Sequence, residues 1–129
     1  MTAAPVRTSR GRCAQARGIA AETLAAEALE RDGWEILARR LRTLAGEIDL
    51  VAQKSGLLAV VEVKSRRHLG EAAAAVSPRQ RTRLIAAADQ VLAEHPDWGA
   101  GGMRFDILVV DAENRVRRIV DAFREGMLA

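Results

Sequence analysis

The sequence has 129 residues, of which 49% are hydrophobic, so it can bury one core and predicts a single domain. Its 20 basic and 17 acidic residues leave a net charge of +3, which weakly favours a polyanionic partner. Cys13 is the only cysteine, which excludes an intrachain disulfide and a cysteine zinc site. A single cysteine is consistent with the reducing cytoplasm, where we expect the protein to reside.

The first 17 residues carry four arginines and no acidic residue. They lack the apolar core of a signal peptide, and no later stretch is apolar over the length of a bilayer, so we expect no membrane association. We predict that residues 1–17 form a disordered basic tail and that residues 18–129 form the folded domain. A solvated tail explains these arginines better than a specific nucleic-acid arm, because short basic tails bind anions loosely.

Residues 19–32 have apolar side chains at helical spacing, and Gly33 supplies a stop, so they predict a helix. Glu22 lies at the edge of the apolar stripe. It is either a solvated glutamate favoured by the helix dipole or part of a functional site. Residues 34–38 alternate apolar and polar side chains and predict the first strand.

Two further strands are predicted around residues 46–50 and 61–64, which are joined through turn residues 54–56. If the hairpin turn consists of residues 55–56, the register places Asp49 directly across from Glu62 and Glu47 across from Lys64, all on one face. Like charges that face each other on a sheet are destabilising, and carboxylates in an apolar hairpin cost more still. The register therefore predicts a bound cation.

Magnesium or manganese would meet this need, because a hard divalent ion accepts one or two carboxylates, a carbonyl and several waters. Lys64 follows Glu62 by two residues on the same strand face and can act on a metal-bound water. This is the chemistry of phosphodiester hydrolysis. A purely structural alternative pairs Glu47 with Lys64, but it leaves Asp49 opposite Glu62.

Downstream, Ser-Pro at residues 77–78 begins a second helix, and residues 105–110 and 116–120 predict two more strands. The predicted order is helix, three strands, helix, strand, strand, an α/β (α+β) arrangement with a mixed sheet flanked by helices. Arg104 and Asp106 share one strand face and predict a structural ion pair. We expect Trp98 to cover the edge of the core and His68 to be exposed or locally hydrogen-bonded.

Asp49 with the triplet Glu62-Val63-Lys64 resembles the PD-(D/E)XK nuclease core. More narrowly, Gly46-Glu47-Ile48-Asp49-Leu50 and the segment from Val61 to Arg66 resemble the YraN-type family of small bacterial proteins, which is related to archaeal Holliday junction resolvases. The resemblance extends from about Gly18 to Phe123. It implies a single restriction-endonuclease-like domain with an αβββαβ core, extended here by one strand.

The resemblance also implies a set of site residues. Asp49 and Glu62, with the Val63 carbonyl, would hold the metal; Glu47 or Glu22 would complete the shell, and Lys64 would assist the reaction. Family members usually carry lysine where this chain has Gln80. Resolvase relatives act as dimers on two-fold substrates, so a homodimer is expected by resemblance.

Five arginines are candidates for contacts with a nucleic-acid backbone, because arginine grips phosphate bidentately. They are Arg42, Arg66, Arg79, Arg81 and Arg83. The last three lie in the first two turns of the second helix, where cations oppose the helix dipole and a bound phosphate would relieve the repulsion. The arginines of residues 39–42 have an alternative role to phosphate binding: as charged residues of an edge strand, they would prevent aggregation.

The sequence therefore predicts a metal-dependent endonuclease acting on branched or otherwise structured DNA. The alternative is a catalytically inactive module of the same fold that binds nucleic acid or a protein partner.

Overall fold

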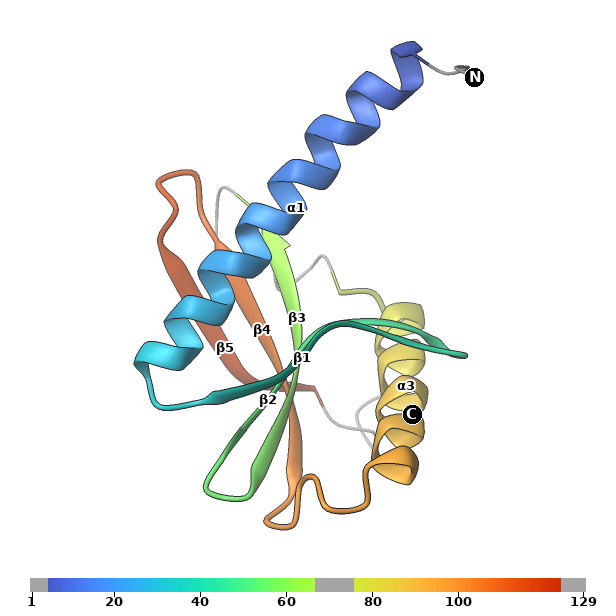
Figure 1. Cartoon of the computed structure of the whole chain (residues 1–129), viewed down its shortest axis with the longest axis vertical. Helices are drawn as coiled ribbons and strands as arrows, with labels where there is room; N and C mark the ends of the chain where they lie inside the picture. Colours follow the sequence, from blue (N-terminus) through green and yellow to red (C-terminus); the bar gives the residue numbers. More distant parts are fainter. Residues whose placement is uncertain (1–4, 67–75, 124–129) are drawn as a thin grey trace.

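The computed structural model describes residues 5–66 and 76–123, with side chains from residue 18 onwards. Its elements, in chain order, are α1 (Pro5–Arg31), β1 (Glu35–Thr43), β2 (Gly46–Lys54), β3 (Leu57–Ser65), α3 (Pro78–Glu94), β4 (Met103–Val110) and β5 (Val116–Phe123) (Figure 1). This order confirms the predicted αβββαβ core with one added strand. His68 lies outside the described residues.

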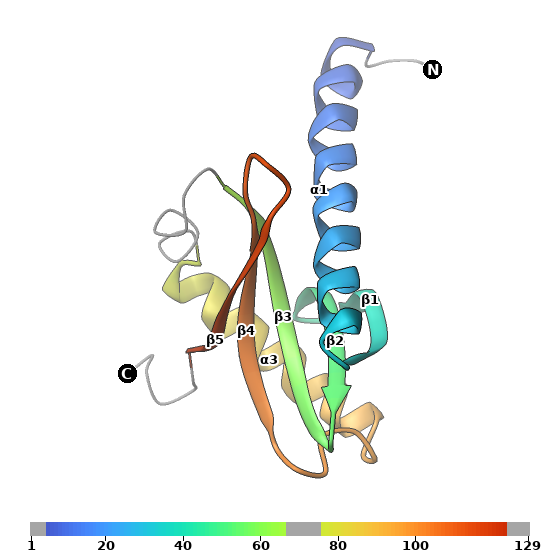
Figure 2. The same cartoon turned by 90° about the vertical axis from the view of Figure 1, so that its left-hand side faces the viewer.

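The five strands form one mixed sheet in the order β1-β2-β3-β4-β5. All neighbouring strands are antiparallel except β3 and β4, which are parallel. Parallel neighbours need a crossover connection, and α3 lies in that connection. The two helices cover opposite faces of the sheet, as Figure 2 shows.

Each face of the sheet has its own apolar cluster. Ala25 and Leu29 of α1 pack with Trp34, Leu50 and Val61 on one face. The second cluster joins α3 to the other face of the sheet and includes Ile48, Val60, Leu84, Ile85, Ala88, Val91, Phe105 and Phe123. Neighbouring positions of β3 therefore enter different clusters, as the two-residue period of a strand requires. Trp98 packs against the second cluster, which confirms its predicted position at the core edge.

The hairpin between β2 and β3 has the predicted turn. Ser55 and Gly56 both have positive φ, 50° and 81°, which is the requirement of the tight two-residue turns that match the twist of a hairpin. The pairing runs from Lys54↔Leu57 to Leu50↔Val61, in the predicted register.

Helix α1 begins at Pro5, so the structure continues this helix through residues 5–17, which the sequence analysis had assigned to a disordered tail. Its other end agrees with the sequence: the helix stops at Arg31, and Gly33 has a φ of 89°, a conformation that glycine adopts easily. Within the described residues, no helix is both long and apolar enough to span a membrane.

Asp106 is fully buried in β4, and its carboxylate connects several elements. It accepts hydrogen bonds from Arg104 at 3.0 to 3.2 Å and from the backbone N–H of Asp121 at 2.8 Å. Arg118 of β5 approaches it at 3.5 Å. Both guanidinium groups lie over the ring of Trp34, 5.3 and 4.9 Å from its centroid, so the predicted Arg104–Asp106 pair is confirmed as part of a structural network.

Replacing Asp106 by Asn should lower the free energy of unfolding by about 3 kcal/mol, because the largely buried Arg104 guanidinium loses its counter-charge, although Arg118 keeps its ion pair with Asp32. Urea denaturation measures the change. Asp97→Asn removes an exposed carboxylate from a loop and serves as the control. Equal stability of the two variants would contradict a structural role for Asp106.

Candidate active site

The side chain of Asp49 continues the contact between β2 and β3 beyond their backbone pairing. The last described pair is Leu50↔Val61. One residue further, Oδ2 of Asp49 accepts a hydrogen bond of 2.8 Å from the backbone N–H of Val63. A side chain thus makes a contact that backbone would make in a regular ladder, and it fixes the carboxylate against the strand that carries Glu62 and Lys64.

The strand β2 is also irregular at Asp49. Ile48 packs in the cluster under α3, whereas Leu50 packs in the cluster under α1, although residues two apart in a regular strand share a face. Arg40, which lies between the partners of these two residues on β1, has a φ of 52°. The side chains of β2 thus change face at Asp49, next to this positive-φ residue of β1, as they do at bulges beside functional sites.

Glu62 is a buried carboxyl group, 9% exposed, beside Asp49. Its Oε2 lies 3.4 Å from Nζ of Lys64 and accepts a hydrogen bond of 3.5 Å from Nε2 of Gln80. Burial, followed by a hydrogen bond with Asp49 and the charge of Asp49, raises the pKa of Glu62 to about 8, and the nearby Lys64 only partly opposes this shift. The structure therefore brings Asp49, Glu62 and Lys64 together, with the two carboxyl groups side by side.

Glu22 approaches the same region from α1. It is buried, and its Oε1 lies 2.9 Å from Nε of Arg40. Burial raises the pKa of Glu22, the charge of Asp49 raises it further, and Arg40 opposes the shift. The solvated-glutamate alternative is therefore wrong, because Glu22 is buried and lies within the electrostatic influence of Asp49.

Glu47 lies at the margin of this cluster. It is exposed, and its Oε2 is 3.8 Å from Nε of Arg42. Lys64 is paired with Glu62, so the structural alternative that paired Glu47 with Lys64 does not describe the ion pairs of these residues.

The five candidate arginines differ in their surroundings. Arg42 is 90% exposed and Arg79 is also exposed, so both are accessible to a ligand. Arg66 donates to the carbonyl of Ser65. Arg81 donates to the carbonyl of Val76 and lies over the ring of Phe123, 5.8 Å from its centroid, which ties it to the core edge.

Arg83 of α3 is exposed, and its side chain packs against Gly46 of the β1–β2 hairpin. A Cβ atom added at Gly46 would be only 2.9 Å from its Cδ, so Gly46 leaves the space that this side chain occupies. The side chain of Arg83 thus reaches the hairpin that carries Arg42.

Comparison with known proteins assigns the chain to a family. Residues 21–110 match the model described as "Uncharacterised protein family UPF0102". The chain belongs to this family. A UPF0102 protein of Granulibacter bethesdensis is 63% identical over 89% of this chain and 73% of its own, and one of Acidiphilium cryptum is 47% identical over 92% and 91%. The resemblance to the YraN-type family is thereby confirmed.

Two residues of the site in this UPF0102 chain were missed by the sequence analysis. Gln80 donates to Glu62, and it is held by a capping box in which its own N–H bonds to Ser77 and its Oε1 accepts from the Ser77 N–H. Arg40 was not among the candidate arginines, yet it forms the ion pair with Glu22. The Ser-x-x-Gln spacing signals the capping box, whereas no local pattern signals the Arg40–Glu22 contact.

The UPF0102 site fits a magnesium ion in one respect and not in another. No three His, Cys, Asp or Glu side chains within residues 18–66 and 76–123 are grouped closely enough to hold a metal by themselves. Asp49 and Glu62 are nevertheless adjacent. Magnesium is commonly bound by two carboxylates together with several waters. A divalent cation between them would relieve the repulsion between the two carboxylates.

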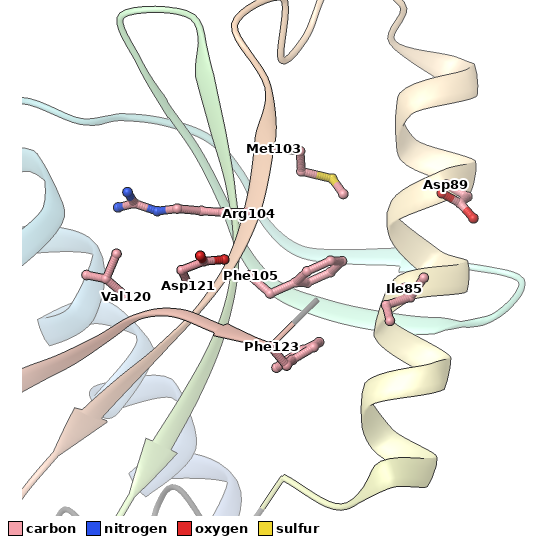
Figure 3. A pocket seen from close by; sticks show the side chains of 8 residues that line it. All are labelled: Ile85, Asp89, Met103, Arg104, Phe105, Val120, Asp121 and Phe123. Carbon is pink, nitrogen blue, oxygen red and sulfur yellow. The ribbon is translucent and has the colours of Figure 1, made fainter. Parts of the chain in front are cut away.

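A hollow of about 560 Å³ lies elsewhere, between α3 and the sheet, and Figure 3 shows its lining. The lining residues are Ile85, Asp89, Met103, Arg104, Phe105, Val120, Asp121 and Phe123. None of them belongs to the carboxylate cluster, and Arg104 is committed to Asp106. We therefore place the candidate site at Asp49 and Glu62 and not in this hollow.

The stability of the metal-free protein should fall as pH rises from about 5 to 9. The pKa of Glu62 is raised to about 8 in the folded state, from an ordinary value of 4.5, so folding favours the neutral acid. The contribution of Glu62 to the free energy of unfolding is complete below pH 4.5 and is lost as pH rises through 8.

Thermal unfolding measured at a series of pH values follows this loss of stability. Glu62→Gln should flatten the profile, whereas Glu94→Gln on the exposed face of α3 should not; identical profiles for both variants would contradict the assignment.

Proposed function

We propose that this protein is a metal-dependent endonuclease that hydrolyses phosphodiester bonds in branched or otherwise structured DNA. The observation that carries the proposal is the contact between the Asp49 and Glu62 carboxyl groups, with the Lys64 ammonium 3.4 Å from Glu62. Two carboxyl groups in contact in a partly buried site destabilise the fold, so their combination with a lysine supports a catalytic role.

Asp49, Glu62 and the Val63 carbonyl would hold magnesium or manganese, which supplies positive charge to the phosphate and a more acidic bound water. Lys64 is mostly buried, and within the described part of the chain it pairs with Glu62, a carboxylate that the metal would also engage. Its ammonium group would orient the attacking water or stabilise charge on the phosphate. Glu22 and Glu47 would act at the margin of the metal shell, and Gln80 would hold Glu62 in position.

Exposed arginines beside this cluster support a nucleic-acid partner. Arg42 lies on the β1–β2 hairpin, Arg83 of α3 packs against the same hairpin at Gly46, and Arg79 lies in the first turn of α3. Such contacts would position the phosphate backbone without reading base sequence, which suits a substrate recognised by its shape. Binding to structured DNA in the cytoplasm, with a homodimer matching a two-fold substrate, is part of the same proposal.

A module of the same fold that binds nucleic acid or protein without cleaving is the second candidate. Lys64 and Gln80 both contact Glu62, so the buried carboxyl group has partners even without a metal. This observation favours the second candidate because an inactive relative could keep the cluster as a structural feature.

Cleavage of a labelled four-way DNA junction separates the two candidates. The wild type should cut the junction with magnesium or manganese, and Lys64→Ala should reduce the rate by about a hundredfold or more, because it removes a charge that acts on the reacting phosphate. Lys54→Ala makes the same charge change at the far end of the hairpin and should retain activity.

Calorimetric titration of each metal into the same proteins provides the second measurement. The wild type should bind the metal, and the Asp49→Asn/Glu62→Gln double variant should not. Absence of binding at millimolar metal, together with an uncut junction, would reject the endonuclease and leave the binding module.

A further inference from the structure

The tip of the β1–β2 hairpin presents a large apolar side chain to solvent. Leu44 is 99% exposed, against 42% for Ile19 and 49% for Val120, the other large hydrophobic residues on the described surface. Figure 1 shows the hairpin crossing α3 and projecting beyond it, so the tip stands clear of the sheet. Single exposed apolar residues are common, and exposure by itself assigns no role.

The tip is held rigidly, which distinguishes Leu44 from a residue in a loose loop. The hydroxyl of Thr43 donates to the carbonyl of Gly46 at 2.7 Å and accepts from the backbone N–H groups of Ala45 and Gly46 at 3.1 Å. The backbone N–H of Leu44 donates to Oε1 of Gln90 on α3 at 2.8 Å. These four bonds fix the backbone of the tip while its side chain stays outside.

Cationic side chains flank the same tip. Arg42, two residues before Leu44, is 90% exposed, and Arg83 from α3 packs over Gly46, two residues after it. A rigid apolar side chain flanked by two arginines is complementary to a nucleic-acid duplex. In a duplex, the apolar faces of the bases lie between two negatively charged backbones. A protein partner with an apolar pocket would not need the flanking cations.

We infer that Leu44 is a wedge that inserts between stacked bases of DNA, while Arg42 and Arg83 hold the phosphates on either side. Apolar side chains that enter base steps unstack them and bend the duplex. The inference rests on the proposed function and narrows its substrate to DNA that unstacks easily, such as a duplex beside a branch point. There the stacking is already interrupted, so insertion costs less than in a continuous duplex.

The spacing of residues along β2 gives the separation between Leu44 and the Asp49–Glu62 carboxylates. Gly46 and Asp49 are three residues apart in one strand, a separation of about 10 Å. Successive base pairs rise by about 3.4 Å. Leu44 lies beyond Gly46 at the hairpin tip, so the unstacked step lies at least about three base pairs from the phosphate at Asp49 and Glu62.

The test uses a four-way junction with 2-aminopurine placed at successive steps from the branch, because this base brightens when it is unstacked. Binding is measured with calcium in place of magnesium, for the wild type, Leu44→Ser, Leu44→Met and Val120→Ser. The wild type and Leu44→Met should brighten the probe at one step. Leu44→Ser should lose this signal and weaken junction binding about threefold to tenfold, because an apolar side chain no longer enters the stack. Val120→Ser, a matched change of an exposed valine on β5, should behave as the wild type.

Each outcome separates the wedge from the catalytic proposal. A brightened probe that depends on Leu44, in a protein that does not cut DNA with magnesium, supports the wedge and rejects the endonuclease. Junction cutting with unchanged probe fluorescence and unchanged binding in Leu44→Ser rejects the wedge and leaves the endonuclease intact. Failure of the wild type to bind the junction overturns both.

Discussion

The contact between the Asp49 and Glu62 carboxyl groups is the constraint on which the organisation of this protein depends. It originates in the two-residue turn at Ser55 and Gly56, whose positive φ values fix the register of the hairpin. A shift of the register by one residue would turn every side chain of one strand to the other face, so the apolar pattern of the hairpin admits no alternative pairing. The fold thereby accepts a repulsive contact in order to bury the rest of the hairpin.

The helices complete the cluster from opposite faces of the sheet. Glu22 of α1 and Gln80 of α3 both reach it, although the helices pack in separate apolar clusters. The irregular backbone at Asp49 makes this possible, because it turns β2 between its two faces at the point where backbone pairing with β3 ends. The site is thus a local departure from regular sheet structure that regular packing on both sides supports.

The sequence was sufficient for the parts of this architecture that depend on local chemistry. Alternating and helical patterns predicted the element order, and the turn residues predicted the register that brings Asp49 to Glu62. The change of face at Asp49 and the Arg40–Glu22 pair were not predictable in this way, because they depend on how β1 packs against both β2 and α1. The orientation of Arg81 towards Val76 and Phe123 likewise depends on β5, which lies forty residues away in the chain.

Asp106 provides an internal comparison for Glu62, since both are buried carboxyl groups of neighbouring parallel strands. Asp106 is surrounded by donors: two guanidinium groups and a backbone N–H within 3.5 Å. Glu62 has one ammonium and one amide at 3.4 and 3.5 Å, and it faces a second carboxyl group. The donors around Asp106 show that this sheet can fully neutralise a buried carboxylate where the role of that carboxylate is structural. The incomplete neutralisation of Glu62 costs stability that a structural ion pair would have retained, and carboxyl groups perturbed in this way gather at functional sites.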